Sequence, residues 1–314
     1  MSRWKSARNL RRWRGRRSGW PVPPPRRPPQ CAPAPWHAFF HEPTSTVTYL
    51  VWDEATGQAA VIDPALDFDA RSGKLAAASA DAILAFAAER GLKIVYVLET
   101  HAHADHLSAA DHIRRATGAA VVIGDQITRV QNHFAKVFAA ADVVPDGSAF
   151  DRLAADGDRL PLGESEIIVL HTPGHTPACV TYLIDGAAYV GDTLFMPDYG
   201  TARTDFPGGD AATLYRSIRR ILDLPPETKI FVGHDYLSGD RTTYAWETNV
   251  AEERAGNVHV RDGIGEAEFV QRRQARDAAL PAPNLLLPSL QVNIRGGRLP
   301  PAEDGRVFLK LPVS

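Results

Sequence analysis

The chain has 314 residues and is 44% hydrophobic, so its length allows one large core or two domains. Its formal net charge is −2, but residues 1–30 carry ten Lys and Arg and no acid, which leaves 25 basic against 37 acidic residues, or −12, in the rest. An acidic body of this kind is not expected to bind a polyanion through its bulk charge.

Residues 1–35 are predicted to form a disordered, basic, Pro-rich extension, because they hold eight prolines and few residues that could build a core. Such a tail can bind nucleic acid or a membrane surface, or act as a transit peptide, but we favour an unstructured extension. No apolar run suits a signal peptide or a membrane span. Cys31 and Cys179 give no disulfide framework and no tetrathiolate zinc site, so we expect a cytoplasmic protein.

Strands and helices alternate along the body, which predicts a mixed α/β fold in layers. The patterns predict strands over 47–52 and 58–62, a helix over 75–90, a strand over 94–98, a helix over 107–116 and a strand over 120–123. A helix over 127–140, strands over 158–160, 167–170, 180–184 and 187–190, a helix over 211–222 and a strand over 229–232 follow. Residues 246–278 are expected to be helical and 281–288 a linker, with edge strands over 290–294 and 307–311.

Four polar clusters follow predicted strands, and strand-end loops gather distant side chains into one crevice. Imidazole and carboxylate are the donors that first-row transition metals prefer. Taken singly, such residues have ordinary structural explanations, for example a helix cap or a turn. For that reason we assign no metal role to His112, His133 and His171. His171 could still lie next to the ligands and orient them. The whole set predicts a metal centre. Its candidate ligands are His101, His103, Asp105, His106, His175, Asp192 and His234.

The run from His101 to His106, followed by His175, Asp192 and His234, resembles the metallo-β-lactamase superfamily over about residues 38–260. The resemblance implies an α/β, metallo-β-lactamase-type αββα four-layer sandwich with the metal at one edge of its two sheets. Residues 202–206 (Ala-Arg-Thr-Asp-Phe) and the pair after His234 are similar to the persulfide dioxygenase branch, which includes bacterial β-lactamase hydrolase-like proteins and is related to glyoxalase II. Residues 198–201 depart from the mitochondrial dioxygenases, which commonly have a Cys before the Arg, and glyoxalase II usually has His-Glu-Tyr where this chain has His-Asp-Tyr.

In that branch the resemblance implies one Fe(II) per chain on His101, His175 and Asp192, with His103, Asp105, His106 and His234 around it. It implies oxidation by O₂ of glutathione persulfide, or a similar low-molecular-weight persulfide, to sulfite. The alternative is a dinuclear zinc thioester hydrolase of the glyoxalase II type. One Zn(II) would then take His101, His103 and His175, and the other Asp105, His106 and His234, with Asp192 bridging. Sequence alone leaves both arrangements open.

Other residues have expected roles around this centre. Tyr236, Asp105 and Arg203 are candidate catalytic residues, with Arg203 pairing either with Asp235 or with a substrate carboxylate. Asp63 is expected to hold the metal-loop backbone or to cap a turn, and Cys179 to be a buried, inert thiol.

The expected organisation is the extension over 1–35, a catalytic domain over 36–265 and a C-terminal extension over 266–314 packed on that domain. The expected partners are a small-molecule persulfide and O₂, with no nucleic acid and no membrane, and a homodimer is left open. Nucleic-acid binding through residues 1–27 is the non-enzymatic alternative.

Overall fold

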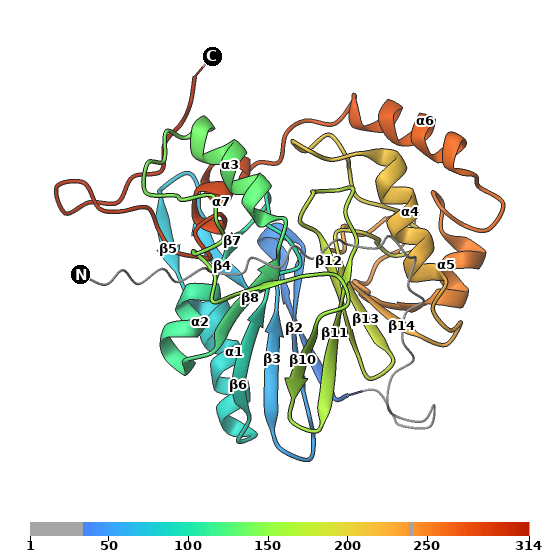
Figure 1. Cartoon of the computed structure of the whole chain (residues 1–314), viewed down its shortest axis with the longest axis horizontal. Helices are drawn as coiled ribbons and strands as arrows, with labels where there is room; N and C mark the ends of the chain where they lie inside the picture. The colour runs from blue at the N-terminus through green and yellow to red at the C-terminus, as the bar shows by residue number, and fades with distance from the viewer. Residues whose placement is uncertain (1–33, 239–240, 314) are drawn as a thin grey trace, which may run out of the picture.

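The structure, a computed structural model, describes residues 34–238 and 241–313, and residues 1–33 of the predicted extension lie outside that range. Figure 1 shows two sheets packed face to face in the centre, with helices on both outer sides. Ala34, which we assigned to the extension, is buried between the sheets, and the carbonyl of Pro35 accepts a hydrogen bond from Trp52 N–H. The boundary of the extension stays a prediction.

The first sheet has the strand order β1-β2-β3-β6-β8-β9. Pairing is antiparallel from β1 to β3 and parallel from β3 to β9. Helices α1 and α2 lie on its outer face (Figure 1). The elements are β1 (Trp36–His41), β2 (Thr46–Trp52), β3 (Gln58–Ile62), α1 (Ala78–Glu89), β6 (Lys93–Leu98), α2 (Ala110–Thr117), β8 (Ala120–Gly124), α3 (Ile127–Val137) and β9 (Arg152–Ala154), with a 3₁₀ turn at Glu42–Thr44. A small sheet of β4 (Ala65–Asp69), β5 (Lys74–Ala76) and β7 (Leu107–Ser108) lies beside the first.

The second sheet has the order β10-β11-β12-β13-β14-β15, with only the β13–β14 pair parallel. Helices α4, α5 and α6 cover its outer side, whereas the last helix, α7, crosses to the side of the first sheet (Figure 1). The elements are β10 (Arg159–Leu162), β11 (Ser165–His171), β12 (Val180–Ile184), β13 (Ala187–Gly191), α4 (Ala211–Leu222), β14 (Lys229–Val232), β15 (Glu247–Asn249), α5 (Val250–Gly256), α6 (Glu266–Asp277) and α7 (Leu286–Asn293).

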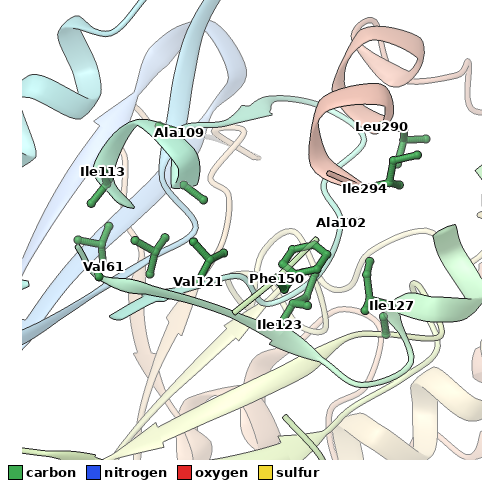
Figure 2. Close-up of a cluster of buried hydrophobic side chains, with 14 of the residues drawn as sticks. Val61, Ala102, Ala109, Ile113, Val121, Ile123, Ile127, Phe150, Leu290 and Ile294 are labelled. Atoms are coloured by element: carbon green, nitrogen blue, oxygen red, sulfur yellow. The ribbon is translucent and has the colours of Figure 1, made fainter. Parts of the chain in front are cut away.

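Three apolar cores separate four layers. In β2, Leu50 faces the outer helices whereas Tyr49 and Val51 face the second sheet, because successive strand residues point to opposite faces. Figure 2 shows the first outer core, in which Val121 of β8 and Leu290 of α7 point into one cluster. A third core joins the second sheet to α4 and α6 through residues such as Ile218 and Phe269. The predicted αββα sandwich is therefore confirmed.

Several element boundaries differ from the sequence patterns. The start of the predicted 75–90 helix is wrong, because residues 74–76 form β5 and the helix begins at Ala78. The predicted 107–116 helix likewise begins late, after β7. The helical stretch 246–278 is divided into β15, α5 and α6. Strands β1 and β4 were not predicted.

Both predicted C-terminal edge strands are wrong. Residues 290–294 belong to the last turn of α7 and its end, and 307–311 form no strand. A short apolar run fits a buried helix as well as a strand, and here Leu290 and Ile294, four residues apart, share the face packed on the core (Figure 2). None of the helices in the described residues is long and apolar enough to cross a bilayer.

Candidate metal centre

Seven His and Asp side chains converge where four strands end. β6 leads to the His101–His106 turn, β11 to His175, β13 to Asp192 and β14 to His234. The His234 loop also joins the first sheet, because Val47 N–H donates to the Gly233 carbonyl and Asp235 N–H to the Ser45 carbonyl. The edge shared by the two sheets therefore forms the site.

Two glycines allow the loops to approach each other. At Gly191 (φ +50°) a Cβ would lie 2.3 Å from Thr100 Oγ1, and at Gly174 (φ +137°) one would lie 2.3 Å from the Leu214 Cα. Positive φ and the lack of a side chain are both needed at these positions. Each glycine directly precedes a candidate ligand, Asp192 or His175.

The donors form two groups in which all donor atoms lie within 4.8 Å of one another: His101, His175 and Asp192 in one, and His103, Asp105, His106 and His234 in the other. In the first group, Asp192 Oδ2 lies 3.9 Å from His101 Nε2 and 3.8 Å from His175 Nε2. The other oxygen, Asp192 Oδ1, lies 3.3 Å from His234 Nε2, so this carboxylate stands between the groups. Two donors at about 2.1 Å from one ion lie at most about 4.2 Å apart, and these distances satisfy that limit.

The donor atoms that face the cluster are buried, and among the described residues they have no hydrogen-bond partner. They are His101 Nε2, His103 Nδ1, Asp105 Oδ2, His106 Nε2, Asp192 Oδ1 and His234 Nε2. Buried polar atoms are normally paired, so such a concentration needs an explanation. Metal bound at this cluster would give such atoms a partner, and the residues fit a metal site.

In most of these histidines, the ring nitrogen that points away from the cluster has a hydrogen-bond partner outside it. His175 Nδ1–H donates to the Arg203 carbonyl at 2.8 Å, and His234 Nδ1–H to the Ser45 carbonyl at 3.2 Å. The Thr100 hydroxyl donates its proton to Asp63, so it accepts from His101 Nδ1 at 3.1 Å. These partners fix the tautomer that leaves the other nitrogen's lone pair for a metal.

His103 is held by two buried carboxylates. Its Nε2 lies 3.0 Å from Asp63 Oδ1 and 3.2 Å from Glu99 Oε2, so its Nδ1 faces the cluster. Burial disfavours the charged ring, but Asp63 and Glu99 outweigh it and hold the pKa of His103 well above its usual value. Asp63 also binds Thr100, which is the loop-holding role expected for it.

The pKa values of His101, His106 and Asp105 are all shifted downwards. Burial, together with the neighbouring His103, lowers the pKa of His106 to about 4, and the pKa of His101 is also well below its usual value, first through burial. These two rings are therefore neutral and ready to donate a lone pair. Burial raises the pKa of Asp105, but the charge on His234 outweighs it, so the net shift is well below the usual value.

A cavity of about 420 Å³ opens at the centre. Asp105, His175 and Asp192 lie on its floor, and Tyr236 on its wall is 40% exposed and stacked on the His234 ring at 5.4 Å between centroids. The aromatic side is completed by Phe195 and Tyr199, and residues 280–285, between α6 and α7, form the opposite rim. The cavity therefore brings metal donors, aromatic side chains and the 280–285 segment around one space.

Three arginines also border the cavity, and they differ in their partners. Arg203 gives a two-pronged ion pair to Asp205, with Nε–Oδ1 at 2.6 Å, and also donates to the Pro281 carbonyl. Arg273 pairs with Asp277 at 2.6 Å and donates to the Thr201 carbonyl. Arg276 is exposed, and no ion-pair partner for it occurs in the described part of the chain; its guanidinium lies 5.5 Å from the centre of the Tyr199 ring.

The expected Arg203–Asp235 pair does not form. Asp235 instead pairs with Arg241 and caps the backbone of Ala245, because Arg203 is engaged by its near neighbour Asp205. Cys179 is buried and accepts hydrogen bonds from Thr176, and burial raises the pKa of its thiol to about 12, as expected of an inert thiol.

Among the histidines left as ordinary, His171 donates to the Pro177 carbonyl at 2.9 Å, and His112 pairs with Asp81 at the surface. Sequence reasoning missed Glu99, Arg241, Arg276 and Asn293. Glu99, one residue before the Thr100 cluster, carried a local signal, and Asn293 lies in a stretch, 291–295, that resembles the bacterial branch of the family.

The model of the metallo-β-lactamase superfamily matches residues 41–234. The chain belongs to this superfamily. It is 51% identical over 288 residues to a probable metallo-hydrolase of Burkholderia pseudomallei (strain 1710b), covering 88% of this chain and 98% of that protein. It is 50% identical over 278 residues to a β-lactamase hydrolase-like protein of Agrobacterium fabrum (strain C58), covering 88% of this chain but only 64% of that protein's length.

Persulfide dioxygenase relatives are more distant. The mitochondrial persulfide dioxygenase ETHE1 of Bos taurus is 30% identical over 275 residues, covering 86% of this chain and 92% of that protein. The crystal structure of ETHE1 from Myxococcus xanthus superposes with a TM-score of 0.67 at 32% identity, covering 84% of this chain and 99% of the other. The resemblance found in the sequence is confirmed, and the chain is a superfamily member with a His/Asp metal site.

Proposed function

We propose that the chain is an iron-dependent persulfide dioxygenase that oxidises glutathione persulfide, or a similar low-molecular-weight persulfide, to sulfite. One persulfide, one O₂ and one water give the thiol, sulfite and two protons. The single observation that carries the proposal is the compact donor group of His101, His175 and Asp192, two of whose members lie on the cavity floor. Three ligands on one face leave coordination positions open, which suits non-haem iron.

Similarity supports the same reaction. The persulfide dioxygenases and this chain share a fold over most of their length, and the ligand positions implied by that resemblance are those of the compact group. A bound ferrous iron supplies the redox chemistry that joins oxygen to the terminal sulfur. The protein residues bind the persulfide, orient it and keep bulk water away.

Three side chains have proposed roles in that binding. Tyr236 lines the cavity with its ring stacked on that of His234, and in this role its hydroxyl donates a hydrogen bond to a sulfur or oxygen there. Asp105 borders the same space beside His234, at 3.1 Å, and orients water and protons. Arg203 ties the 280–285 rim to the floor through Pro281, and so shapes the entrance.

The second candidate is a dinuclear metallo-hydrolase acting on thioesters. One observation favours it: the group of His103, Asp105, His106 and His234 is also complete, and Asp192 stands between the two groups. More similar relatives carry metallo-hydrolase and hydrolase-like names. The two proposals differ in metal number, metal type and substrate.

Two measurements on one preparation test the proposal. The full chain is purified without oxygen and its metal content is determined, and then oxygen uptake with glutathione persulfide is compared with hydrolysis of S-lactoylglutathione. We expect about one iron per chain and persulfide-dependent oxygen uptake. Two zinc ions per chain with thioester hydrolysis, and no oxygen uptake, would establish the hydrolase instead.

A further inference from the structure

A side chain from the C-terminal helix reaches the turn that carries three candidate ligands. Asn293, the last residue of α7, donates from Nδ2 to the carbonyls of His103 and His106, at 2.8 Å each. Its Oδ1 accepts from Ser108 N–H, also at 2.8 Å. The residue is 4% exposed, and both amide hydrogens and the carbonyl oxygen of its side chain are used.

These three bonds join groups far apart in sequence. The turn from His103 to Ser108 is 185 to 190 residues before Asn293. Residues 103–106 of this turn are irregular backbone between β6 and β7, so the carbonyls of His103 and His106 have no regular ladder to pair with. Asn293 supplies the partners that a strand or a helix would supply elsewhere.

The position of Asn293 is itself fixed by packing. Leu290 and Ile294 place one face of α7 in the outer core (Figure 2). Gln131 of α3 donates to the Ile294 carbonyl at 3.0 Å, which holds the helix end. Gly297, just after the helix, packs so closely on α2 that a Cβ there would lie 2.9 Å from Asp111 N. The amide is therefore presented to the turn from a rigid support.

We propose that Asn293 is a positioning residue for the metal centre. By fixing the carbonyls of His103 and His106, it sets where the side chains of His103, Asp105 and His106 point. Residues that orient ligands from outside typically change metal affinity or activity by about 10–100-fold when removed. The inference rests on the His/Asp metal site of the superfamily, and it holds for iron and for zinc.

The chain offers a matched control on the same helix. Gln291 is also a buried amide, 2% exposed, and it also uses its donor and acceptor on backbone groups. Its Nε2 donates to the Lys310 carbonyl at 2.9 Å, and its Oε1 accepts from Lys310 N–H at 2.7 Å. It ties down the C-terminal segment, and its side-chain hydrogen bonds within the described residues go to Leu287 and Lys310, not to the metal turn. Gln291→Ala therefore removes bonds of the same kind in a different place.

The experiment compares full-length Asn293→Ala and Gln291→Ala with the unchanged protein. Purified holoenzyme is equilibrated with a competing chelator to give the Kd of the metal, and cobalt-grown protein gives a visible spectrum that reports ligand geometry. We expect Asn293→Ala to raise the Kd by about 10–100-fold and to shift the cobalt bands. Gln291→Ala should leave the Kd within about twofold and the cobalt bands in place. This should hold even where its melting temperature falls as far as that of Asn293→Ala.

Asn293→Asp covers the case in which the alanine variant does not fold. It keeps the size of the side chain and the acceptor for Ser108 N–H, but it loses both donors to the His103 and His106 carbonyls. We expect the same direction of change in the Kd and in the cobalt bands. An unchanged Kd and spectrum in the folded Asn293 variant, or an equal weakening in Gln291→Ala, would overturn the positioning role.

Discussion

Asp63 accepts two hydrogen bonds from Thr100, one from its backbone N–H and one from its hydroxyl, both at 2.7 Å. Because the hydroxyl proton is directed to Asp63, the Thr100 oxygen can accept from His101 Nδ1. One carboxylate just after β3 thus determines which nitrogen of His101 faces the metal. Asp63 holds a left-handed backbone conformation, with φ +50°, to reach this position.

The first prediction concerns this carboxylate. Asp63→Ala leaves the Thr100 N–H buried without an acceptor and removes one of the two carboxylates at His103, so we expect a loss of about 1–3 kcal/mol in stability and weaker metal binding. Thermal unfolding and metal analysis measure both. Asp69→Ala is the control, because Asp69 accepts similar bonds from Arg71 and Ser72 in an exposed turn. A change at such an exposed position should leave the unfolding curve nearly unchanged, and equal losses in the two variants would contradict the role of Asp63.

The ligand set was predictable from sequence because its information is local. His101, His103, Asp105 and His106 lie within six residues, and each cluster follows an apolar run that reads as a strand. Helix α4 and strand β14 were also predicted at their observed bounds, since each has a clear period and flanking stop signals.

What could not be predicted depends on contacts between distant segments. Asn293 gains its role only when α7 packs beside β7, and the run around it was read as a strand. The partner of Asp235 was also misjudged: Asp235 pairs with Arg241, and Arg203 pairs with Asp205, two residues away. Whether a short apolar run forms a helix or a strand is decided by its tertiary neighbours, which a single sequence does not display.

The second prediction separates the two metal arrangements. In the proposed mononuclear site, Asp192→Ala abolishes metal binding because it removes the only carboxylate of the three-donor group, whereas His234→Ala keeps the iron and loses rate by roughly 10–100-fold. Metal content of the two purified variants gives the answer. A fall from two metals to one in His234→Ala would contradict the mononuclear site, and oxygen uptake should then be absent in the unchanged protein too.

The third prediction concerns substrate binding. Arg276 is the arginine at the cavity without an ion-pair partner among the described residues, so we expect it to pair with a carboxylate of the thiol carrier. Arg276→Ala should raise KM for glutathione persulfide by about tenfold and leave kcat nearly unchanged, because the contact is made equally in the bound and transition states. Arg272→Ala is the control on the same helix, where Arg272 pairs with Glu268. A fall in kcat with KM unchanged would argue against a binding role.

The fourth prediction concerns a buried acid far from the metal donors. Glu253 on α5 is fully buried; one of its oxygens accepts from Asn257 Nδ2 at 2.7 Å, and the other has no hydrogen-bond partner within residues 34–238 and 241–313. Burial raises the pKa of its carboxyl from 4.5 to about 8. In the folded state the group is therefore neutral at pH 7.

The sign of its effect on stability follows from that shift. Between pH 4.5 and about 8 the folded chain keeps a proton on Glu253 that the unfolded chain has released. The contribution of Glu253 to folding stability is therefore fully present below pH 4.5 and is lost as the pH rises to about 8. Glu253→Gln keeps the shape with a permanently neutral amide. We expect it to match the unchanged protein near pH 5 and to be more stable by a few kcal/mol near pH 8.5. Denaturant unfolding at several pH values gives the difference between the two curves. Glu252→Gln, one residue earlier on the helix, should follow the unchanged protein throughout, and parallel curves for Glu253→Gln as well would show that Glu253 does not titrate in this range.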